Sequence, residues 1–306
     1  MIVSPAAYED GRTIWRLEAE PGDIEPSRST LWIEGFVRQF SPVTETLWLA
    51  LALQPFARHR LVVPTIGFSR LGKAIGEILG VTVAGREGTR EEEPSQREFS
   101  AVLVRDSLDL FVAQLASSPA SHTIEMVASP VGASAGTTAL RIATNAGSLR
   151  REVRPLDRLG ELASSIMLAP TLCLRSLDSF ACREEMADVN PASLSRLCAL
   201  AGVRLSLPFA EVSVRSMGRH AASLGIPPIV AFRNLWKRYQ MAPEVVAELY
   251  RELAPSLVGT EADGPALRIA EYFEGLFPTI VSTSDVHEAF DDTFFADVAA
   301  GTALRA

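Results

Sequence analysis

Several features that mark common protein classes are missing from this sequence. It has three cysteines, an odd number with no C-x-x-C pair, so neither a disulfide framework nor a cysteine metal site is indicated. None of its four histidines is spaced from another histidine or a cysteine as a zinc site needs. Its most apolar run, LWLALAL at 47–53, is too short to cross a bilayer and predicts a buried helix. We therefore expect reduced, partly buried thiols in a cytoplasmic protein with no membrane segment.

The familiar catalytic motifs are also missing. Without G-x-S-x-G or G-x-G-x-x-G, simple serine hydrolases and dehydrogenases are unsupported. One run, IGFSRLGKA at 66–74, places Gly67, Gly72 and Lys73 at the spacing of a Walker A loop. Ala74, however, stands where that loop needs a hydroxyl to ligate magnesium, and apolar residues recur at core spacing through the run. We interpret the run as an amphipathic helix that tolerates two glycines.

The charge balance argues against one class of partner. The chain has 306 residues, of which 47% are hydrophobic, and its net charge is −8. A nucleic-acid groove needs a basic face to neutralise phosphates, so we expect no nucleic-acid partner. Whether the chain forms a homo-oligomer stays open.

A charged segment divides the chain into two parts. Residues 87–98 hold almost no apolar side chain and predict a solvated linker between a small N-terminal α/β unit, 1–86, and a larger part, 99–306. In the N-terminal unit we predict strands at 13–20, 29–36, 60–66 and 81–84, a helix that starts at Ser41-Pro42, and a helix at 69–79.

Strands and helices alternate again beyond the linker. We predict strands at 101–104, 123–129, 151–156 and 204–209, and helices at 107–116, 139–147, 157–168, 191–202 and 212–225. From Pro228 onward the pattern is wholly helical. This alternation predicts an α/β fold with a parallel sheet and a helical C-terminal third.

The stretch AVLVRDSLDLFVAQLA, residues 101–116, reads as a strand, a turn and a helix start. Such turns hold phosphate, because the N–H groups at a helix start are unpaired and partly positive. They are usually rich in glycine, whereas this turn, from Arg105 to Leu110, has none. From the residues alone, an altered nucleotide loop and an ordinary strand-to-helix turn both stay open.

This stretch resembles the S-G-G-x-D-S nucleotide loop of the PP-loop ATP pyrophosphatases, the adenine nucleotide α-hydrolase-like proteins. Arg105, Asp106 and Ser107 stand where Ser-Gly-Gly would be, Asp109 keeps the aspartate, and Leu110 replaces the last serine. The carboxylate of Asp106 beside a phosphate would repel it by about 1 kcal/mol in water at about 4 Å. The Arg105 guanidinium either compensates for this by pairing with phosphate or closes the site by pairing with a neighbouring aspartate.

A second stretch, residues 202–246, resembles two branches of the same superfamily. GVRLSLPFAEVSV is similar to the asparagine synthetase block G-x-E-x-R-x-P-F-L-D, with Glu211 in place of the aspartate. In the RNLWK…APEVV segment, Arg233 and Lys237 keep the positive charges of that family. EVSVRSMGRHAASLGIP is similar to a helix of the 7-cyano-7-deazaguanine synthases, although their zinc cysteines are missing here. The resemblance covers about residues 100–255.

The resemblance implies a parallel sheet of the PP-loop (HUP) type and ATP with Mg²⁺ as cofactors. It implies an asparagine-synthetase-like ligase that adenylates a small carboxylate and passes it to an amine. Asp109 would then lie on the metal side, Arg105 and Ser107 would contact the nucleotide, and Arg233 and Lys237 would stabilise the leaving pyrophosphate. The alternative, indicated by the missing loop glycines, is a catalytically silent relative that serves as a binding or structural partner.

Basic residues of the C-terminal half leave one further choice open. Either they gather at the mouth of the sheet to hold a phosphate or they form a solvated helix surface. The residues concerned are Arg215, Arg219, Arg233, Lys237 and Arg238.

Overall fold

A computed structural model describes the architecture of most of the first 213 residues. The described residues are 1–34, 41–88, 98–105, 109, 122–127, 139–151, 158–186, 189–213 and 216. The chain divides into two compact units, one of Met1–Arg105 with Ala116–Glu211 and one of Asp106–Leu115 with Val212–Ala306. The account below concerns the first unit, to which both sheets belong. Part of the predicted linker, 89–97, lies outside the described residues, so the linker stays a prediction.

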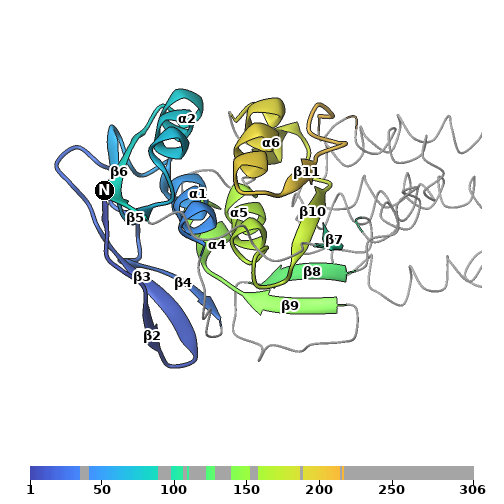
Figure 1. Cartoon of the computed structure of the whole chain (residues 1–306), viewed down its shortest axis with the longest axis horizontal. Coiled ribbons are helices and arrows are strands. Elements are labelled where there is room, and N and C mark those ends of the chain that lie inside the picture. Colours follow the sequence, from blue (N-terminus) through green and yellow to red (C-terminus); the bar gives the residue numbers. More distant parts are fainter. Residues whose placement is uncertain are drawn as a thin grey trace, which may run out of the picture. The chain divides into compact units, whose positions relative to one another are not determined.

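The N-terminal strands form a mixed six-stranded sheet (Figure 1). Its strands are β1 (Ile2–Val3), β2 (Ala7–Glu9), β3 (Arg12–Glu18), β4 (Thr30–Glu34), β5 (Arg60–Ile66) and β6 (Thr82–Glu87). The order is β2-β3-β1-β5-β6, with β4 paired to the other edge of β3. In β3 buried residues alternate with exposed ones, which places Trp15 and Leu17 in the core. Strands β3, β4, β5 and β6 confirm the prediction within a few residues.

Helix α1 (Pro42–Leu53) is buried on almost every side, as its apolar sequence predicted. Pro42 occupies the first helical turn, where a missing N–H costs nothing. Ser41 precedes the helix as expected, but its hydroxyl accepts no N–H group from the first turn. Instead the Thr44 hydroxyl donates to the Ser41 carbonyl over 3.0 Å.

The Walker-like run forms helix α2 (Ser69–Leu79), which confirms its interpretation as an amphipathic helix. Gly67 is needed for packing, because a Cβ there would lie 2.9 Å from the backbone N and Cα of Val43. Lys73 is exposed and lies 3.9 Å from Glu77 one turn later. The helix ends at Gly80, whose φ of 71° suits a residue without a Cβ.

The second sheet has five strands, all parallel, which confirms an α/β fold with a parallel sheet. Its strands are β7 (Phe99–Leu103), β8 (His122–Val127), β9 (Ala139–Ala143), β10 (Leu174–Ser179) and β11 (Arg204–Ser206). The order is β11-β10-β7-β8-β9. The chain therefore winds outward from β7 through β8 to β9, then returns to the other side of β7 with β10 and β11.

Two elements of this sheet differ from the sequence prediction. Residues 139–147, predicted as one helix, form β9 and then α4 (Ala146–Arg151), because β9 completes a parallel ladder with β8. Strand β10, which lies between β11 and β7, was not predicted at all. Its sequence LRSLDS mixes polar and apolar residues, and its serines 176 and 179 are buried between neighbouring strands.

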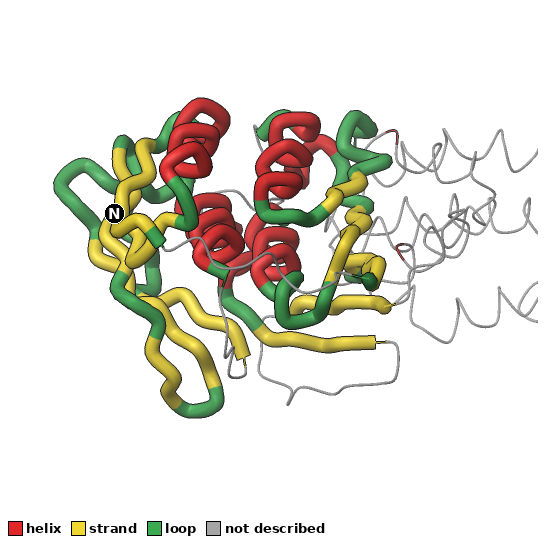
Figure 2. The backbone as a smooth tube through the Cα atoms, in the orientation of Figure 1, coloured by secondary structure: helices red, strands yellow, loops and turns green. Residues whose placement is uncertain are grey.

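Helices α1, α4 and α5 (Leu159–Met167) lie between the two sheets (Figures 1 and 2). A buried set of polar contacts, which we name the tryptophan seam, joins β3, α1 and α5 and consists of Trp15, Glu45, Trp48 and Ser164. The indole N–H of Trp15 donates to Glu45 over 2.7 Å, and that of Trp48 donates to the Ser164 hydroxyl over 2.9 Å. The two indole rings meet edge to face at 4.5 Å.

Asn145 links the two sheets directly. Its side-chain oxygen accepts the Trp32 N–H over 2.8 Å, and its amide donates to the Thr30 carbonyl over 2.8 Å. The neighbouring Thr144 hydroxyl donates to the Trp32 carbonyl over 2.9 Å. The edge of β4 is thereby paired with the end of β9, and both sheets share one continuous core.

Helix α6 (Pro191–Leu200) completes the described fold. Asn190 caps it by accepting the N–H groups of Ala192 and Ser193. All three cysteines lie in the described part and form no disulfide; Cys182 and Cys198 are buried, and Cys173 is half-buried. Burial raises the pKa of Cys198 to about 12, so this thiol is inert. Among the helices described, none has the length and apolarity needed to span a membrane.

Candidate functional site

The order of the parallel sheet marks one place as the candidate site. Between β7 and β10 the direction of winding reverses, and open α/β sheets bind ligands beside the carboxyl ends of the strands at such a switch point. Arg105 follows β7 here, and the 3₁₀ helix η1 (Arg183–Met186) follows β10. The start of α5 reaches the same place, since the Arg158 N–H donates to the Glu185 carbonyl over 2.9 Å.

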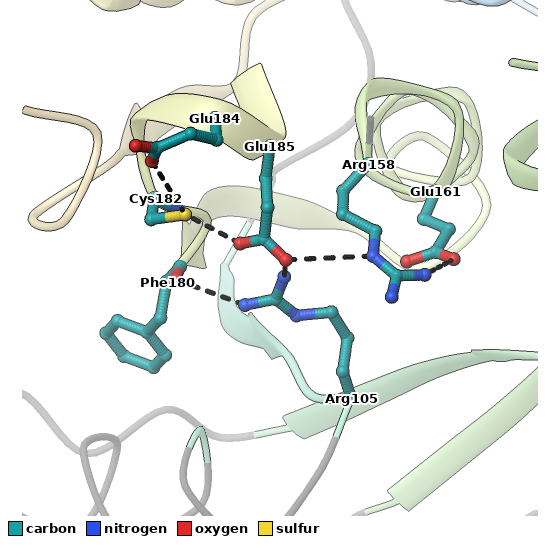
Figure 3. Close-up of polar contacts among 7 residues, drawn as sticks. All are labelled: Arg105, Arg158, Glu161, Phe180, Cys182, Glu184 and Glu185. Atoms are coloured by element: carbon teal, nitrogen blue, oxygen red, sulfur yellow. Dashed lines mark hydrogen bonds and ion pairs between the residues drawn. The ribbon is translucent and has the colours of Figure 1, made fainter. Parts of the chain in front are cut away.

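Four charged side chains meet at this point, and we name them the switch-point cluster: Arg105, Arg158, Glu161 and Glu185 (Figure 3). Glu185 lies at its centre and is fully buried. One of its carboxylate oxygens accepts from Arg105 over 2.5 Å, and the other accepts the backbone N–H of Cys182 over 2.9 Å. Arg105 also donates to the Phe180 carbonyl over 3.1 Å. The guanidinium of Arg105, which follows β7, is therefore held by two groups of the segment that follows β10.

Arg158 is less well satisfied than Arg105. Its Nη1 donates to Glu161 over 3.0 Å, one helical turn away. Its Nε lies 3.6 Å from the Glu185 carboxylate oxygen that Arg105 already holds. That distance allows ionic attraction but is too long for a hydrogen bond. The Nε is buried and has no hydrogen-bond partner within the described part of the chain.

Burial and the neighbouring charges shift the pKa of Glu161. Burial raises this pKa, while the positive charges of Arg158 and Arg105 oppose that rise and the charge of Glu185 adds to it. With two guanidinium and two carboxyl groups, the four named side chains balance when all are charged. Arg105 and Arg158 keep 10% and 16% of their side chains exposed, so the cluster meets solvent on one side.

The predicted site residues are only partly covered by the structure. Arg105 follows β7, the strand predicted before it, and pairs with Glu185. Asp109 is buried in the second compact unit. Ser107, Arg233 and Lys237 lie outside the described residues, as do Arg215, Arg219 and Arg238. The grouping of these residues into a nucleotide site therefore stays a prediction.

Sequence reasoning missed three members of the cluster: Arg158, Glu161 and Glu185. Arg158 and Glu161 carried a usable signal, because opposite charges three residues apart on a helix lie on one face. Glu185 carried none, since its importance depends on β10 lying beside β7. Glu184 and Glu185 are adjacent in sequence, yet the first is exposed and the second is buried.

The described residues suit anion binding better than metal chemistry. In the described ranges there is no group of three histidine, cysteine, aspartate or glutamate side chains that could hold a metal ion. Two guanidinium groups and one backbone N–H face a single carboxylate, and such donors also bind phosphate.

A comparison with protein-family models, curated proteins and solved structures found no match for this chain.

Proposed function

We propose that this chain is a catalytically silent relative of the PP-loop proteins and serves as a binding or structural partner. The proposal depends mainly on one observation, the ion pair of 2.5 Å between Arg105 and Glu185. If the chain used ATP, Arg105 would be the residue that compensates for the missing loop glycines. Its guanidinium is instead engaged by Glu185 and by the Phe180 carbonyl.

Two further observations support the silent role. The Glu185 carboxylate places negative charge where a nucleotide would bring its phosphates, and buried like charges repel strongly. The sequence between Arg105 and Leu110 also has no glycine that would let backbone N–H groups approach an anion closely. Both features oppose pyrophosphate binding at the start of the helix.

The experiment compares thermal stability with and without MgATP. A ligand that binds the folded state raises the melting temperature by mass action. We expect no rise for the wild-type chain in millimolar MgATP relative to magnesium alone, and no release of pyrophosphate with small carboxylates. Asp106→Gly tests the cause, because a gain of ATP binding in this variant identifies the loop as the defect.

An ATP-dependent ligase that adenylates a small carboxylate is the second candidate. It is favoured by the position of Arg105 at the switch point of a parallel sheet, where α/β proteins bind ligands. A melting temperature that rises with MgATP, together with pyrophosphate release that depends on Arg233 and Lys237, would replace the silent role with this one.

A further inference from the structure

We propose that Arg105, Arg158 and the backbone N–H of Cys182 form a phosphate-binding site that the chain occupies with its own Glu185 carboxylate. The ligand class is a small phosphate monoester, which must displace Glu185 to bind. This inference rests on the proposed binding role, for which it names the ligand.

The first argument is the convergence of donors. Three N–H groups from three separate segments point at one carboxylate: Arg105 after β7, Arg158 before α5, and Cys182 after β10 (Figure 3). Such an arrangement at the carboxyl edge of a parallel sheet is typical of anion sites. Glu185 therefore fills the position that an external anion would take.

The second argument is that a carboxylate fits this site incompletely. It has two oxygens for three donors, so one oxygen goes to the Cys182 N–H and the other is shared by the two arginines. Arg105 Nη1 lies 2.5 Å from the shared oxygen, Glu185 Oε1, and forms the ion pair with it. Arg158 Nε lies 3.6 Å from the same oxygen and has no hydrogen bond. A tetrahedral phosphate offers further oxygens and can serve all three donors.

The third argument concerns access. Glu185 lies on a four-residue 3₁₀ helix, and such helices have poorer hydrogen-bond geometry than α-helices. Its turn is held by the N–H groups of Glu185 and Met186, both of which donate to the Cys182 carbonyl. Both arginines keep partial contact with solvent. Displacing Glu185 therefore requires local movement of one turn and not of a strand.

The carboxyl group of Glu161 opposes phosphate binding when it is charged, and a raised pKa reduces this repulsion. Glu161 lies 3.0 Å from Arg158 and would repel a phosphate when charged. Burial raises its pKa, so the carboxyl accepts a proton more readily than an exposed glutamate does. Displacement of Glu185 and protonation of Glu161 would remove both carboxylate charges of the switch-point cluster from its two guanidinium groups.

The test uses the full chain with inorganic phosphate as the probe, and sodium chloride at matched ionic strength as the reference. Glu185→Ala and the shape-matched Glu185→Gln remove the competing charge. We expect the melting temperature of both variants to rise with phosphate at concentrations at least tenfold lower than the wild type requires. Glu184→Gln, which removes the adjacent exposed carboxylate, is the matched control and should respond like the wild type.

Two additional arms identify the site and the ligand class. Arg158→Met in the Glu185→Gln background should abolish the phosphate response, because it removes one of the three donors. Sodium acetate replaces phosphate in the second arm and should give a weaker response, since it offers two oxygens.

Three results would overturn the inference: folded Glu185 variants with no greater phosphate response than Glu184→Gln, a response that survives loss of Arg158, or a stronger response to acetate. If neither Glu185 variant folds in chloride, recovery on refolding decides: rescue by phosphate alone supports the site, and equal failure in both salts refutes it. These outcomes do not involve MgATP, so failure here is distinct from failure of the silent role.

Discussion

The tryptophan seam and the switch-point cluster are both buried and polar, but they differ in how completely their polar groups are paired. In the seam, each indole N–H meets one acceptor at ordinary hydrogen-bond distance, and only Glu45 can carry a charge. In the cluster, four ionisable groups meet, and the buried Arg158 Nε has no hydrogen-bond partner in the described part. The paired contacts of the seam hold β3, α1 and α5 together, whereas the imperfectly paired charges of the cluster are the basis of the proposed exchange of Glu185 for a ligand.

Breaking the cluster should have the largest effect on stability. Arg105→Met leaves the fully buried Glu185 without its closest positive partner, and loss of one partner of a buried ion pair costs about 3–5 kcal/mol. Urea denaturation of the two proteins measures this difference in the free energy of unfolding.

A double variant sharpens the same point. Arg105→Met with Glu185→Leu removes both charges, so we expect it to regain much of the lost stability. If the double variant is as unstable as the sum of the single variants, the pair is not coupled and the cluster has been misassigned.

Breaking the seam should cost less. Ser164→Ala removes the acceptor of the Trp48 indole N–H, and an unsatisfied buried donor costs about 1–3 kcal/mol. The neighbouring Ser165 is the matched control, because it is equally buried but its hydroxyl only donates to the Glu161 carbonyl over 3.2 Å. Thermal denaturation should show a clearly larger loss for Ser164→Ala than for Ser165→Ala.

The tryptophan seam and the switch-point cluster each contain a buried glutamate that should make the free energy of unfolding depend on pH, and single variants can separate the two contributions. Burial raises the pKa of Glu45, against the hydrogen bond from Trp15, and it also raises the pKa of Glu161. A raised folded-state pKa means that the folded chain keeps the proton longer than the unfolded chain. The stability that such a buried glutamate contributes is complete below the ordinary glutamate pKa of 4.5. It is lost as pH rises through the higher pKa of the folded state.

Glu45→Gln should therefore flatten the decline of unfolding free energy as pH rises above 4.5, because it keeps an acceptor for Trp15 without a titratable group. The exposed Glu77→Gln is the control for loss of a charge. A decline that persists unchanged in Glu45→Gln would assign it to Glu161 and the cluster instead.

The smallest effect is expected at an exposed pair of comparable geometry. Arg141 and Glu125 form two hydrogen bonds of 2.9 Å between β9 and β8, but about two fifths of each side chain is exposed. Solvent and salt screen such a pair. Arg141→Gln should leave the melting temperature unchanged, and a loss comparable to that of Arg105→Met would show that distance, and not burial, governs these pairs.

Local signals predicted the N-terminal elements well. Strand β5 and helix α2 were predicted with their observed bounds, because alternation and 3.6-residue periodicity are properties of short segments. Proline in the first turn of α1 and glycine after α2 also acted as predicted. The short strands β1 and β2 were not predicted. In the parallel sheet the failures were β9 and β10, whose polar residues are explained only by their neighbours, as when the Ser176 hydroxyl donates to that of Ser100 over 2.7 Å.

One member of the switch-point cluster could be singled out from the sequence, but its partners could not. Arg105 was singled out from the strand-turn-helix pattern, and it lies at the switch point of the sheet. Its partner Glu185 is 80 residues away in sequence, and no periodicity connects the two. Arg158 and Glu161 could have been paired by their helical spacing, but not assigned to this site.

By itself, the sequence determined the α/β class, the buried character of α1 and the position of Arg105 soon after a strand. These follow from local patterns of apolar, charged and helix-terminating residues, which act within a few positions along the chain. Only the tertiary structure decided that β10 lies beside β7, and hence that Glu185 meets Arg105 and leaves Arg158 partly unsatisfied. The reason is physical: burial and ion pairing depend on distances in space, and the strand order that sets those distances is a property of the whole fold.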